Sequence, residues 1–499
     1  MVRRLWVLLV GCWAVAVVAA DPPAQALGTP RALTAQELQA DLAVLRRSYE
    51  LLHPGLYRYR TPAQVDAAWA ELAQAWSRDQ TLPQAYLALS RFTAYLQCGH
   101  TYPNFYNQGA AVRAAVLEAP RLPLEVRWLD GRMVVTRSYA TDPRLRAGAE
   151  IVSIDGVPTP DILAALMPYV RADGSNDAKR VANLEVQGLD RYEAFDVYYP
   201  LVFPRRPDAP FELVVRPSPG ATAERVVVSP IAAGAREARA GAPRDDANPW
   251  QTRSLGTGID YLKMPTWALY DSKWDWAAWL DGYFRELVAS GSRDLVIDLR
   301  GNEGGLSIGD RLLAHLTERD LPADPIERRT RYRSVPADLR PYLATWDDSF
   351  YDWGQDAVDL GGNWYRLTRY DDDEAGPVVK PIAPDYTGRV WVLVGAMNSS
   401  ATFEFAEAIA RNRLGTLVGQ TTGGNQRGIT GGAFFFMTLP RSGIEVDVPL
   451  IGQFPVSATP LPDAGLEPHV RVTPTAADIA AGRDVELEMV LALIRGGHG

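Results

Sequence analysis

Hydrophobic residues between positions 30 and 118 recur with the period of an α-helix. The first such stretch contains Leu38, Leu42, Leu45, Tyr49 and Leu52. A spacing of three or four residues places them on one helical face. Thr34 and Glu37 stand just before this stretch in the spacing of a capping box. Apolar positions keep the same period through residues 65–76 and 85–96. The pattern predicts a helical N-terminal domain over residues 30–118.

Residues 119–235 change to short runs in which apolar and polar positions alternate. Such alternation over residues 124–128 and 133–136 is typical of β-strands. Residues 148–156 (Gly-Ala-Glu-Ile-Val-Ser-Ile-Asp-Gly) read as a strand that ends in an Asp-Gly turn. We therefore expect a β-rich domain over residues 119–235.

From residue 236 to residue 490, apolar strands alternate with helical stretches. Residues 295–299 precede a helical pattern at 308–316, and residues 390–394 precede one at 401–413. This alternation predicts a mainly parallel sheet with helices on its faces. The fold class we expect is therefore α/β, in several domains.

The composition narrows the class of partner. The chain of 499 residues has a net charge of −9, and an acidic surface disfavours nucleic acid. Its 5 histidines are scattered, and no group of cysteines and histidines has the spacing of a zinc site. We expect neither a metal nor a cofactor.

Residues 1–26 have the pattern of a cleaved export signal. Arg3 and Arg4 precede an apolar run at 5–20, and small residues offer cleavage sites after positions 20 and 26. The run is shorter than the ~20 apolar residues that a transmembrane helix needs. We therefore expect export to the periplasm or the medium without a transmembrane span. Cys12 lies in a sequence that resembles a lipoprotein box, so a lipid anchor is the alternative. After cleavage at either site Cys98 is the remaining cysteine, which excludes an internal disulfide.

Two polar turns follow strands of the expected parallel sheet, Arg300-Gly-Asn-Glu-Gly-Gly305 and Ser399-Ser400. The carboxyl ends of such strands are where active sites lie in open α/β sheets. A serine at a helix start is often only a cap. It also lies beside free helix amides, and the flexible Gly304–Gly305 turn can aim another amide at the same point, as in an oxyanion hole. Position alone leaves both interpretations open.

A nucleophilic serine needs a base. The loop at 419–425 contains no lysine, and the nearest cation, Arg427, stays protonated. A histidine is then the natural candidate. His100 follows a helical pattern and stands among polar and aromatic residues. A histidine in a loop can equally be structural.

Several motifs in this order resemble peptidase family S41, the tail-specific or C-terminal processing serine proteases. Residues 298–305 are similar to the family's Asp-Leu-Arg-x-Asn-x-Gly-Gly signature. Residues 400–402 resemble its nucleophile segment, and residues 419–424 its Gly-x-x-Thr-x-Gly loop. Residues 465–468 are similar to its late Gly-Val-x-Pro-Asp element, with His469 where aspartate is usual.

The resemblance also implies a domain arrangement. Residues 148–156 are similar to the core of the PDZ domain of the family. The expected domains are thus a PDZ-like domain over 119–235 and a protease core over 236–490. The core would have the ClpP/crotonase-like fold.

Site roles follow from the same resemblance. It implies Ser400 as the nucleophile, because this serine directly precedes alanine in the motif. It implies the amides of Ala401 and Gly305 as oxyanion donors, with Gly304 as a further candidate. The processing proteases use a lysine base, but Asn425 occupies the matching position here.

The tricorn-like branch of the family instead uses a histidine base from an N-terminal segment. Gly99-His100-Thr101 resembles its Asp-Gly-His-Thr motif, with Cys98 where aspartate is usual. The resemblance therefore implies His100 as the general base. An acidic residue late in the core helps the site in that branch, and the match here is Asp463. Glu467 and Glu445 are the alternatives for the acid that would orient the imidazole.

These features predict an exported serine endopeptidase or processing protease that cleaves a peptide or protein substrate. One alternative is a catalytically inactive member of the fold that binds apolar ligands or peptides. Another is a scaffold that tethers peptides through the PDZ-like segment. Because His100 and Ser400 belong to different expected domains, the active site would assemble where the helical domain docks on the core.

Overall fold

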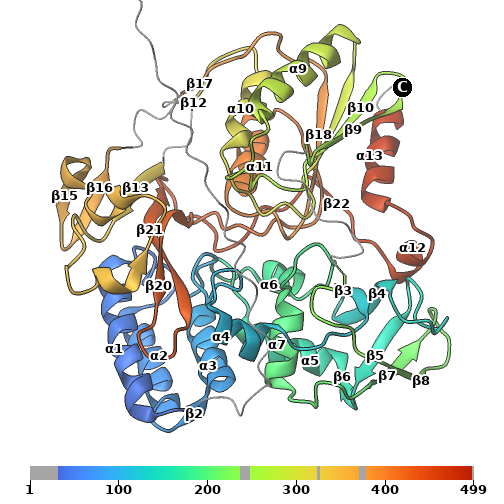
Figure 1. Cartoon of the computed structure of the whole chain (residues 1–499). Helices are drawn as coiled ribbons and strands as arrows, with labels where there is room; N and C mark the ends of the chain where they lie inside the picture. The colour runs from blue at the N-terminus through green and yellow to red at the C-terminus, as the bar shows by residue number, and fades with distance from the viewer. Residues whose placement is uncertain (1–31, 237–247, 323–325, 370–377, 497–499) are drawn as a thin grey trace, which may run out of the picture.

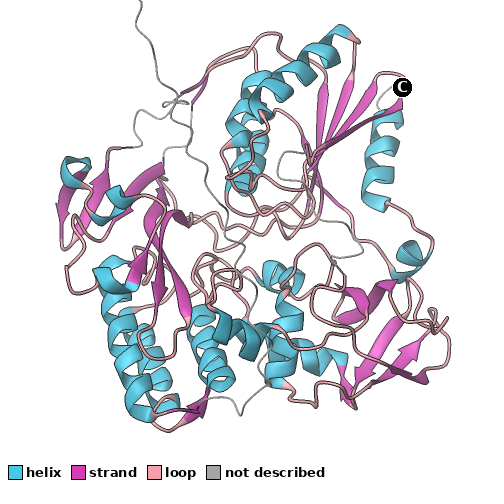
Figure 2. Ribbon diagram, viewed as in Figure 1, coloured by secondary structure: helices cyan, strands magenta, loops and turns pink. Residues whose placement is uncertain are grey.

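The computed structural model describes residues 32–236, 248–322, 326–369 and 378–496. The expected export signal, with Cys12, lies outside these residues. Among the described residues, no helix combines the length and the apolar character needed to cross a bilayer. Figure 2 shows three separate groups of strands, with helices beside each of them.

Three long helices form the N-terminal unit, as the helical period predicted. They are α1 (Ala35–Leu52), α2 (Pro62–Ala75) and α3 (Leu82–Tyr95). Each begins with a threonine capping box, and the one predicted at Thr34 and Glu37 is present. The short strands β1 (Ala32–Leu33) and β2 (Gln80–Thr81) pair beside them, and α4 (Ala110–Val112) with the π-helical turn η1 (Arg113–Leu117) completes the unit.

The second unit is built on an antiparallel sheet in the order β3-β4-β5-β7-β8. Its strands are β3 (Leu124–Leu129), β4 (Arg132–Ser138), β5 (Glu150–Ile154), β7 (Phe211–Arg216) and β8 (Glu224–Val228), and β6 (Val157–Pro158) pairs with β5. The expected Asp-Gly turn joins β5 to β6, with φ of +49° at Asp155 and +82° at Gly156. The accompanying helices are α5 (Thr159–Leu166), the 3-10 turn η2 (Met167–Tyr169), α6 (Asp177–Asn183) and α7 (Ala194–Val202).

The mainly parallel sheet expected in the C-terminal half is present, in the order β22-β19-β18-β11-β10-β9. Every neighbouring pair is parallel except β9 with β10. The strands are β9 (Gln251–Gly256), β10 (Ile259–Lys263), β11 (Asp294–Asp298), β18 (Arg389–Val394), β19 (Thr416–Gly419) and β22 (Val470–Arg471).

Helices cover both faces of this sheet (Figure 1). The helices α9 (Trp276–Ala289), α10 (Ile308–His315) and α11 (Ala401–Asn412) pack on the face to which Leu295 and Ile297 point. The last helix, α13 (Val485–Gly496), packs on the other face against Val296, and α12 (Ala476–Ala480) precedes it. Burial on both faces explains why the β11 sequence is apolar throughout apart from its terminal aspartates.

A second sheet, which is antiparallel, is separate from the parallel sheet and packs against the N-terminal helices. Its order is β14-β20-β21-β13-β16-β15, and α1 packs on β21. The strands are β13 (Ile326–Thr330), β14 (Leu343–Ala344), β15 (Ala357–Gly361), β16 (Trp364–Leu367), β20 (Thr430–Thr438) and β21 (Glu445–Pro455). Close by are the pair β12 (Leu321–Pro322) and β17 (Val378–Val379) and the 3-10 turns η3 (Arg340–Tyr342), η4 (Asp348–Tyr351) and η5 (Gly354–Asp356).

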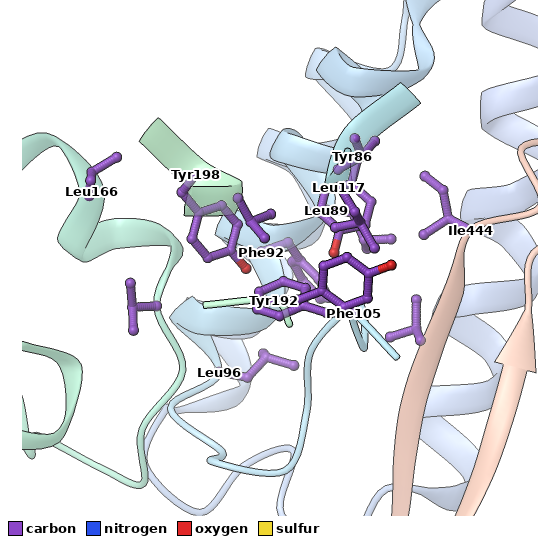
Figure 3. Packing of buried hydrophobic residues seen from close by; sticks show 14 of the residues in the cluster. Tyr86, Leu89, Phe92, Leu96, Phe105, Leu117, Leu166, Tyr192, Tyr198 and Ile444 are labelled. Carbon is purple, nitrogen blue, oxygen red and sulfur yellow. The ribbon is translucent and has the colours of Figure 1, made fainter. Parts of the chain in front are cut away.

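The hydrophobic core therefore divides the chain differently from the expected boundary at residue 236. One cluster joins the N-terminal helices, the second unit and the β20–β21 hairpin, whereas a separate cluster lies under the parallel sheet. Figure 3 shows Tyr86 and Leu89 of α3, Tyr198 of α7 and Ile444 around the same core. Sequence periodicity could not reveal this, because the hairpin lies about 350 residues from the helices that it covers.

Candidate active site

Ser400 occupies the first turn of α11, at the carboxyl end of the parallel sheet. Its backbone has φ +51° and ψ −133°, a region that non-glycine residues rarely enter. Although Ser400 stands at the N-cap position, its side chain makes no capping hydrogen bond. Helix capping, the first interpretation of this serine, is therefore not its role.

Asn398 fixes the turn that carries Ser400 to the end of β11. Its Nδ2 donates to the carbonyls of Leu299 at 2.6 Å and Asn302 at 3.0 Å, and its Oδ1 accepts from the Gly395 amide at 2.8 Å. The neighbouring Ser399 hydroxyl lies 3.3 Å from the Glu303 carbonyl oxygen. The two polar turns identified from the sequence thus meet, and Ser399 supports the turn between them.

Gly304 and Gly305, which end the 300–305 turn, have no room for side chains, and Gly304 lies against Ser400. Gly304 has φ +102°, and a Cβ there would lie 3.1 Å from the Ser400 Cβ. Gly305 has φ +138°, and a Cβ there would lie 2.3 Å from the Trp267 carbonyl oxygen. Glycine is required at both positions because the backbone is left-handed and the neighbours are close.

The amides of this turn are not equivalent as oxyanion donors. The Gly304 amide already donates to Asn302 Oδ1 at 2.9 Å, which argues against Gly304 as a donor to substrate. For the Gly305 and Ala401 amides, no acceptor is present among the described residues. These two amides remain the candidates for an oxyanion hole.

His100 follows α3 in a tight loop and lies against β20. A Cβ on Gly431 would be 3.5 Å from the His100 ring, and the ring centroids of His100 and Phe434 are 5.8 Å apart. In the described part of the chain the Nδ1 atom of His100 is buried without a hydrogen-bond partner. Phe434 faces the imidazole, while its neighbour Phe435 is fully buried.

The His100 loop is held by residues on either side of it. His53 ends α1, and its Nε2 lies 2.7 Å from the Thr101 Oγ1. The buried Cys98 thiol, which replaces the aspartate usual in the motif, hydrogen-bonds with the His100 amide and with Thr101. Burial raises the pKa of this thiol to about 12, so it is protonated and inert at neutral pH.

Charged side chains from the second unit lie between the His100 loop and the Ser400 turn. Arg171 Nη1 donates to the Gly99 carbonyl at 2.7 Å, and Asp173 Oδ1 accepts from the Gly99 amide at 2.8 Å. On the other side, Lys179 Nζ contacts the Glu303 carboxylate and donates to the Met397 carbonyl at 3.1 Å. Arg171 also reaches Glu303 at 3.5 Å.

This cluster sets the charge state of the site. Partial burial alone would raise the pKa of Glu303, but Lys179 and Arg171 outweigh it and hold that pKa at about 2. Burial lowers the pKa of His100, and Arg171 and Lys179 lower it further, while Asp173 and Glu303 oppose them. The imidazole is therefore neutral at neutral pH, as a general base must be.

His100 and Ser400 thus lie on two sides of one charged cluster. Among the described residues there is no hydrogen bond between the imidazole and the Ser400 hydroxyl. Arg171 binds the Gly99 carbonyl in the His100 loop and also reaches Glu303. Gly304, which follows Glu303 in the chain, lies against Ser400. Nucleophile–base contacts are often longer without substrate than in the reacting complex.

The acids expected to orient His100 are bound elsewhere. Both oxygens of Asp463 are occupied: they accept from the Ser175 amide and hydroxyl at 2.9 Å each and from Asn425 Nδ2 at 2.7 Å. Glu467 pairs with Thr421 and Arg471, and Glu445 lies on β21 against Gln108. None of the three contacts His100. In this structure Asp463 stabilises the turn at 174–175.

Arg171, Asp173, Lys179 and Glu303 were not identified from the sequence. Glu303 lies inside the glycine-rich motif at 298–305, but its role depends on partners about 130 residues earlier in the chain. The sequence feature that could have indicated these residues is the polar run at 171–179 (Arg-Ala-Asp-Gly-Ser-Asn-Asp-Ala-Lys). This run lies in the second unit, where only the strand pattern was used to interpret the sequence.

Comparisons with known proteins agree with this architecture. The family model of peptidase family S41 matches residues 258–472. A search of curated protein sequences gave no significant match. The structure of mature CPAF complexed with lactacystin resembles the chain with a TM-score of 0.64 and 17% identity, over 92% of this chain and 98% of the other. Another structure of mature CPAF resembles the chain with a TM-score of 0.59 and 18% identity, over 89% of this chain and 94% of the other.

A photosystem II D1 C-terminal processing protease is more distant, with a TM-score of 0.40 and 17% identity over 88% of this chain and 93% of that one. At these identities the likeness to solved structures concerns the fold alone. The sequence match covers the 298–305 signature, Ser400 and the 419–424 loop. Residues 258–472 of the chain therefore match peptidase family S41, a family of serine-type peptidases.

Proposed function

We propose that this protein is an exported serine endopeptidase or processing protease in which Ser400 is the nucleophile and His100 the general base. The observation that carries the proposal is the geometry at Ser400. Its strained, non-capping backbone stands directly against a glycine turn with a free Gly305 amide. A serine that only capped α11 would need neither the strain nor the close glycine pair.

The mechanism begins with attack of Ser400 Oγ on the scissile carbonyl carbon. The Ser400 proton passes to His100, and the carbonyl electrons move to an oxyanion that the Gly305 and Ala401 amides stabilise. The protonated imidazole then donates to the leaving amine as the C–N bond breaks. Water, deprotonated by the same imidazole, hydrolyses the acyl-enzyme and restores the Ser400 hydroxyl.

The surroundings of His100 favour an extended peptide as substrate. Strand β20 is paired with β21 along its length, but its other edge meets only the two-residue strand β14, at Phe436 and Met437. Phe434, Phe436 and Trp346 form an aromatic surface on this strand, with ring centroids of Trp346 6.0 and 5.8 Å from the other two. Trp346 is 59% exposed, so this surface is open to a ligand. An edge strand with apolar side chains is suited to adding a peptide strand.

Turnover of a mixed peptide library tests the proposal. Wild type should cleave and react with a serine-directed phosphonate, and Ser400→Ala and His100→Ala should abolish both. Ser399→Ala is the matched control, since it removes the neighbouring hydroxyl and should retain most activity. Absence of turnover and of labelling in the wild type, together with binding of an apolar ligand, would instead identify an inactive binding module.

Export is part of the proposal and has its own test. N-terminal sequencing of the protein made in a bacterial host should give a start just after residue 20 or residue 26. Incorporation of labelled fatty acid that Cys12→Ser abolishes would show a lipid anchor instead.

A further inference from the structure

The segment at 171–179 of the second unit binds every loop of the proposed site. At one end, Arg171 donates a hydrogen bond to the carbonyl of Gly99, the residue before His100, and Asp173 accepts one from the Gly99 amide. At the other end, Lys179 holds Glu303 and the Met397 carbonyl. In between, Asn176 Nδ2 donates to the carbonyls of Thr422 at 2.9 Å and Gly424 at 2.7 Å.

Within that segment, Asp173 stands apart by its charge. The carboxylate of Glu303 is matched by two cations, Lys179 and Arg171. Asp173 is 3% exposed and forms no ion pair within the described residues, and its Oδ1 accepts a hydrogen bond from the neutral Gly99 amide. It is thus a buried acid beside the imidazole that is not held in an ion pair.

The structure offers a different acid, Asp173, which lies in the second unit, far earlier in the chain than the expected candidates Glu445, Asp463 and Glu467. We propose that Asp173 is the positioning residue of His100 and supplies the counter-charge for the imidazolium that forms during catalysis. The inference rests on the proposed function, because it assumes that His100 accepts the proton of Ser400.

The need for such a carboxylate follows from the surroundings of His100. The groups facing the imidazole are Asp173 and Glu303, which are acidic, and Arg171 and Lys179, which are basic. The two acids and the two bases balance, so the site in which the imidazolium forms has no net charge of its own only while Asp173 is present. Without Asp173 the charged intermediate would be formed in a partly buried, net positive site, which raises the barrier.

The imidazole has a free atom for this contact. Nδ1 of His100 is buried and without a partner among the described residues, and a buried donor that lacks a partner costs about 1–3 kcal/mol. Asp173 Oδ1 is used by Gly99, which leaves Oδ2 for Nδ1–H. Gly99 is required for this approach, because a Cβ there would lie 2.5 Å from Asp173 Oδ2.

Asp463 then acts one step further away. Asn425 Nδ2 donates both to the Asp173 carbonyl at 3.2 Å and to Asp463 Oδ1. Asp463 also holds the amide and the hydroxyl of Ser175. It therefore supports the backbone of the turn that carries Asp173 and does not face the imidazole.

The test compares Asp173→Asn, Asp173→Glu and Asp463→Asn with wild type across pH. Asp173→Asn should lower kcat/KM by roughly 10²–10⁴-fold, mainly through kcat. It should also move the acid limb of the profile to lower pH, because Asp173 raises the pKa of His100. Asp173→Glu should recover part of the rate and of the limb position, and Asp463→Asn should leave the limb in place.

A measurement on the wild type keeps the inference testable if an Asp173 variant fails to fold. The ¹⁵N shifts of the histidine rings, with His100 assigned by its loss in His100→Gln, report which nitrogen carries the proton. A predominantly Nδ1–H tautomer is expected, since Asp173 accepts from that atom. An Nε2–H tautomer alone overturns the inference.

The inference also fails if folded Asp173→Asn keeps turnover within a few-fold of wild type and the same acid limb. In that case wild-type turnover that still depends on Ser400 and His100 leaves the proposed function intact. If wild type shows no Ser400-dependent turnover, the proposed function fails first, and the tautomer measurement still decides whether Asp173 holds His100.

Discussion

At Ser400 the backbone takes φ +51° and ψ −133°, while the flanking Ser399 lies outside the left-handed region. A non-glycine residue in such a region costs on the order of 1–3 kcal/mol. The structure maintains it through Asn398, which joins the turn to the segment after β11 at two points and accepts a third hydrogen bond from Gly395 within the turn. Strain at this residue is compensated by hydrogen bonds at its neighbours.

Replacement of Ser400 by glycine should separate strain from chemistry. Ser400→Gly should abolish turnover and still increase the free energy of unfolding by about 1 kcal/mol, because glycine enters this region freely. Ser399→Gly is the control: it removes a hydroxyl close to two carbonyls and should destabilise. Urea unfolding of both variants measures the difference. Equal destabilisation by the two replacements would contradict the strain at Ser400.

The pH profile should identify the base. Burial lowers the pKa of His100 below its ordinary value of about 6.5, and the base works only when neutral. The value of kcat/KM should therefore rise with pH along a single limb centred below pH 6.5 and be level near pH 7. A lysine base would place that limb far higher. A limb above pH 7.5 in the wild type would exclude His100 in this role.

The antiparallel hairpin of β20 and β21 carries a group of aromatic side chains on one strand and a pair of buried carboxyl groups on the other. On β20, Phe434 and Phe436 alternate with buried Phe435, so this aromatic run is divided between the core and the surface. On β21, Glu445 and Asp447 are both buried and lie on the same face of the strand, two residues apart. Both arrangements follow from the two-residue period of a β-strand, in which successive side chains point to opposite faces.

Trp346 should affect peptide binding more than chemistry. Trp346→Ala is expected to raise KM about 5- to 10-fold for peptides with large apolar residues, which corresponds to about 1–1.4 kcal/mol, with little change in kcat. Trp364→Ala on β16, near the opposite edge of the sheet, is the control and should leave KM unchanged. Steady-state kinetics on two peptides, one with bulky and one with small residues, distinguishes the variants. An equal change for both peptides would argue against a side-chain contact.

The carboxyl pair on β21 should weaken the fold at high pH. Burial raises the pKa of both Glu445 and Asp447, and the charge of Asp447 raises the pKa of Glu445 further. The folded state then retains protons that the unfolded chain releases above about pH 4–5, so stability falls as pH rises through the folded pKa values. Glu445→Gln should therefore raise Tm at pH 9 relative to wild type and change it little at pH 5. A larger loss of Tm at pH 9 than at pH 5 would show the opposite sign.

Across the whole molecule, the site depends on the second unit as much as on the other two. The His100 loop belongs to the N-terminal helices, Ser400 belongs to the parallel sheet, and the 171–179 segment contacts both. Figure 1 shows α6, which carries Lys179, between the parallel sheet and the N-terminal helices. Movement of the second unit relative to the parallel sheet would therefore disturb the proposed catalytic geometry.

Removing Lys179 should test this dependence. Lys179→Met is expected to destabilise by about 1–3 kcal/mol, since it deletes a charged donor to Glu303 and to the Met397 carbonyl. It should also lower kcat, because the turn beside Ser400 loses its support. Arg225→Met, whose partner Glu212 is exposed, should cost at most about 1 kcal/mol and leave kcat unchanged. Thermal unfolding with steady-state kinetics would show a structural role alone if stability fell and kcat did not.

Local patterns in the sequence determined the elements and the turns. Helical period and capping residues predicted α1, alternation predicted the second unit, and the strand–helix alternation predicted the parallel sheet. The glycine turn and Ser399–Ser400 were placed together correctly because parallel strands bring their carboxyl ends to one edge. Such features depend on residues a few positions apart, which the chain itself displays.

The tertiary structure alone decided which side chains surround the imidazole. Asp463 was expected there and instead binds Ser175 and Asn425, whereas Asp173 and Arg171 hold Gly99. It also decided that β20 and β21 share a core with the N-terminal helices. Contacts between residues hundreds of positions apart are set by how whole units pack, and no spacing along the chain encodes which carboxylate reaches His100.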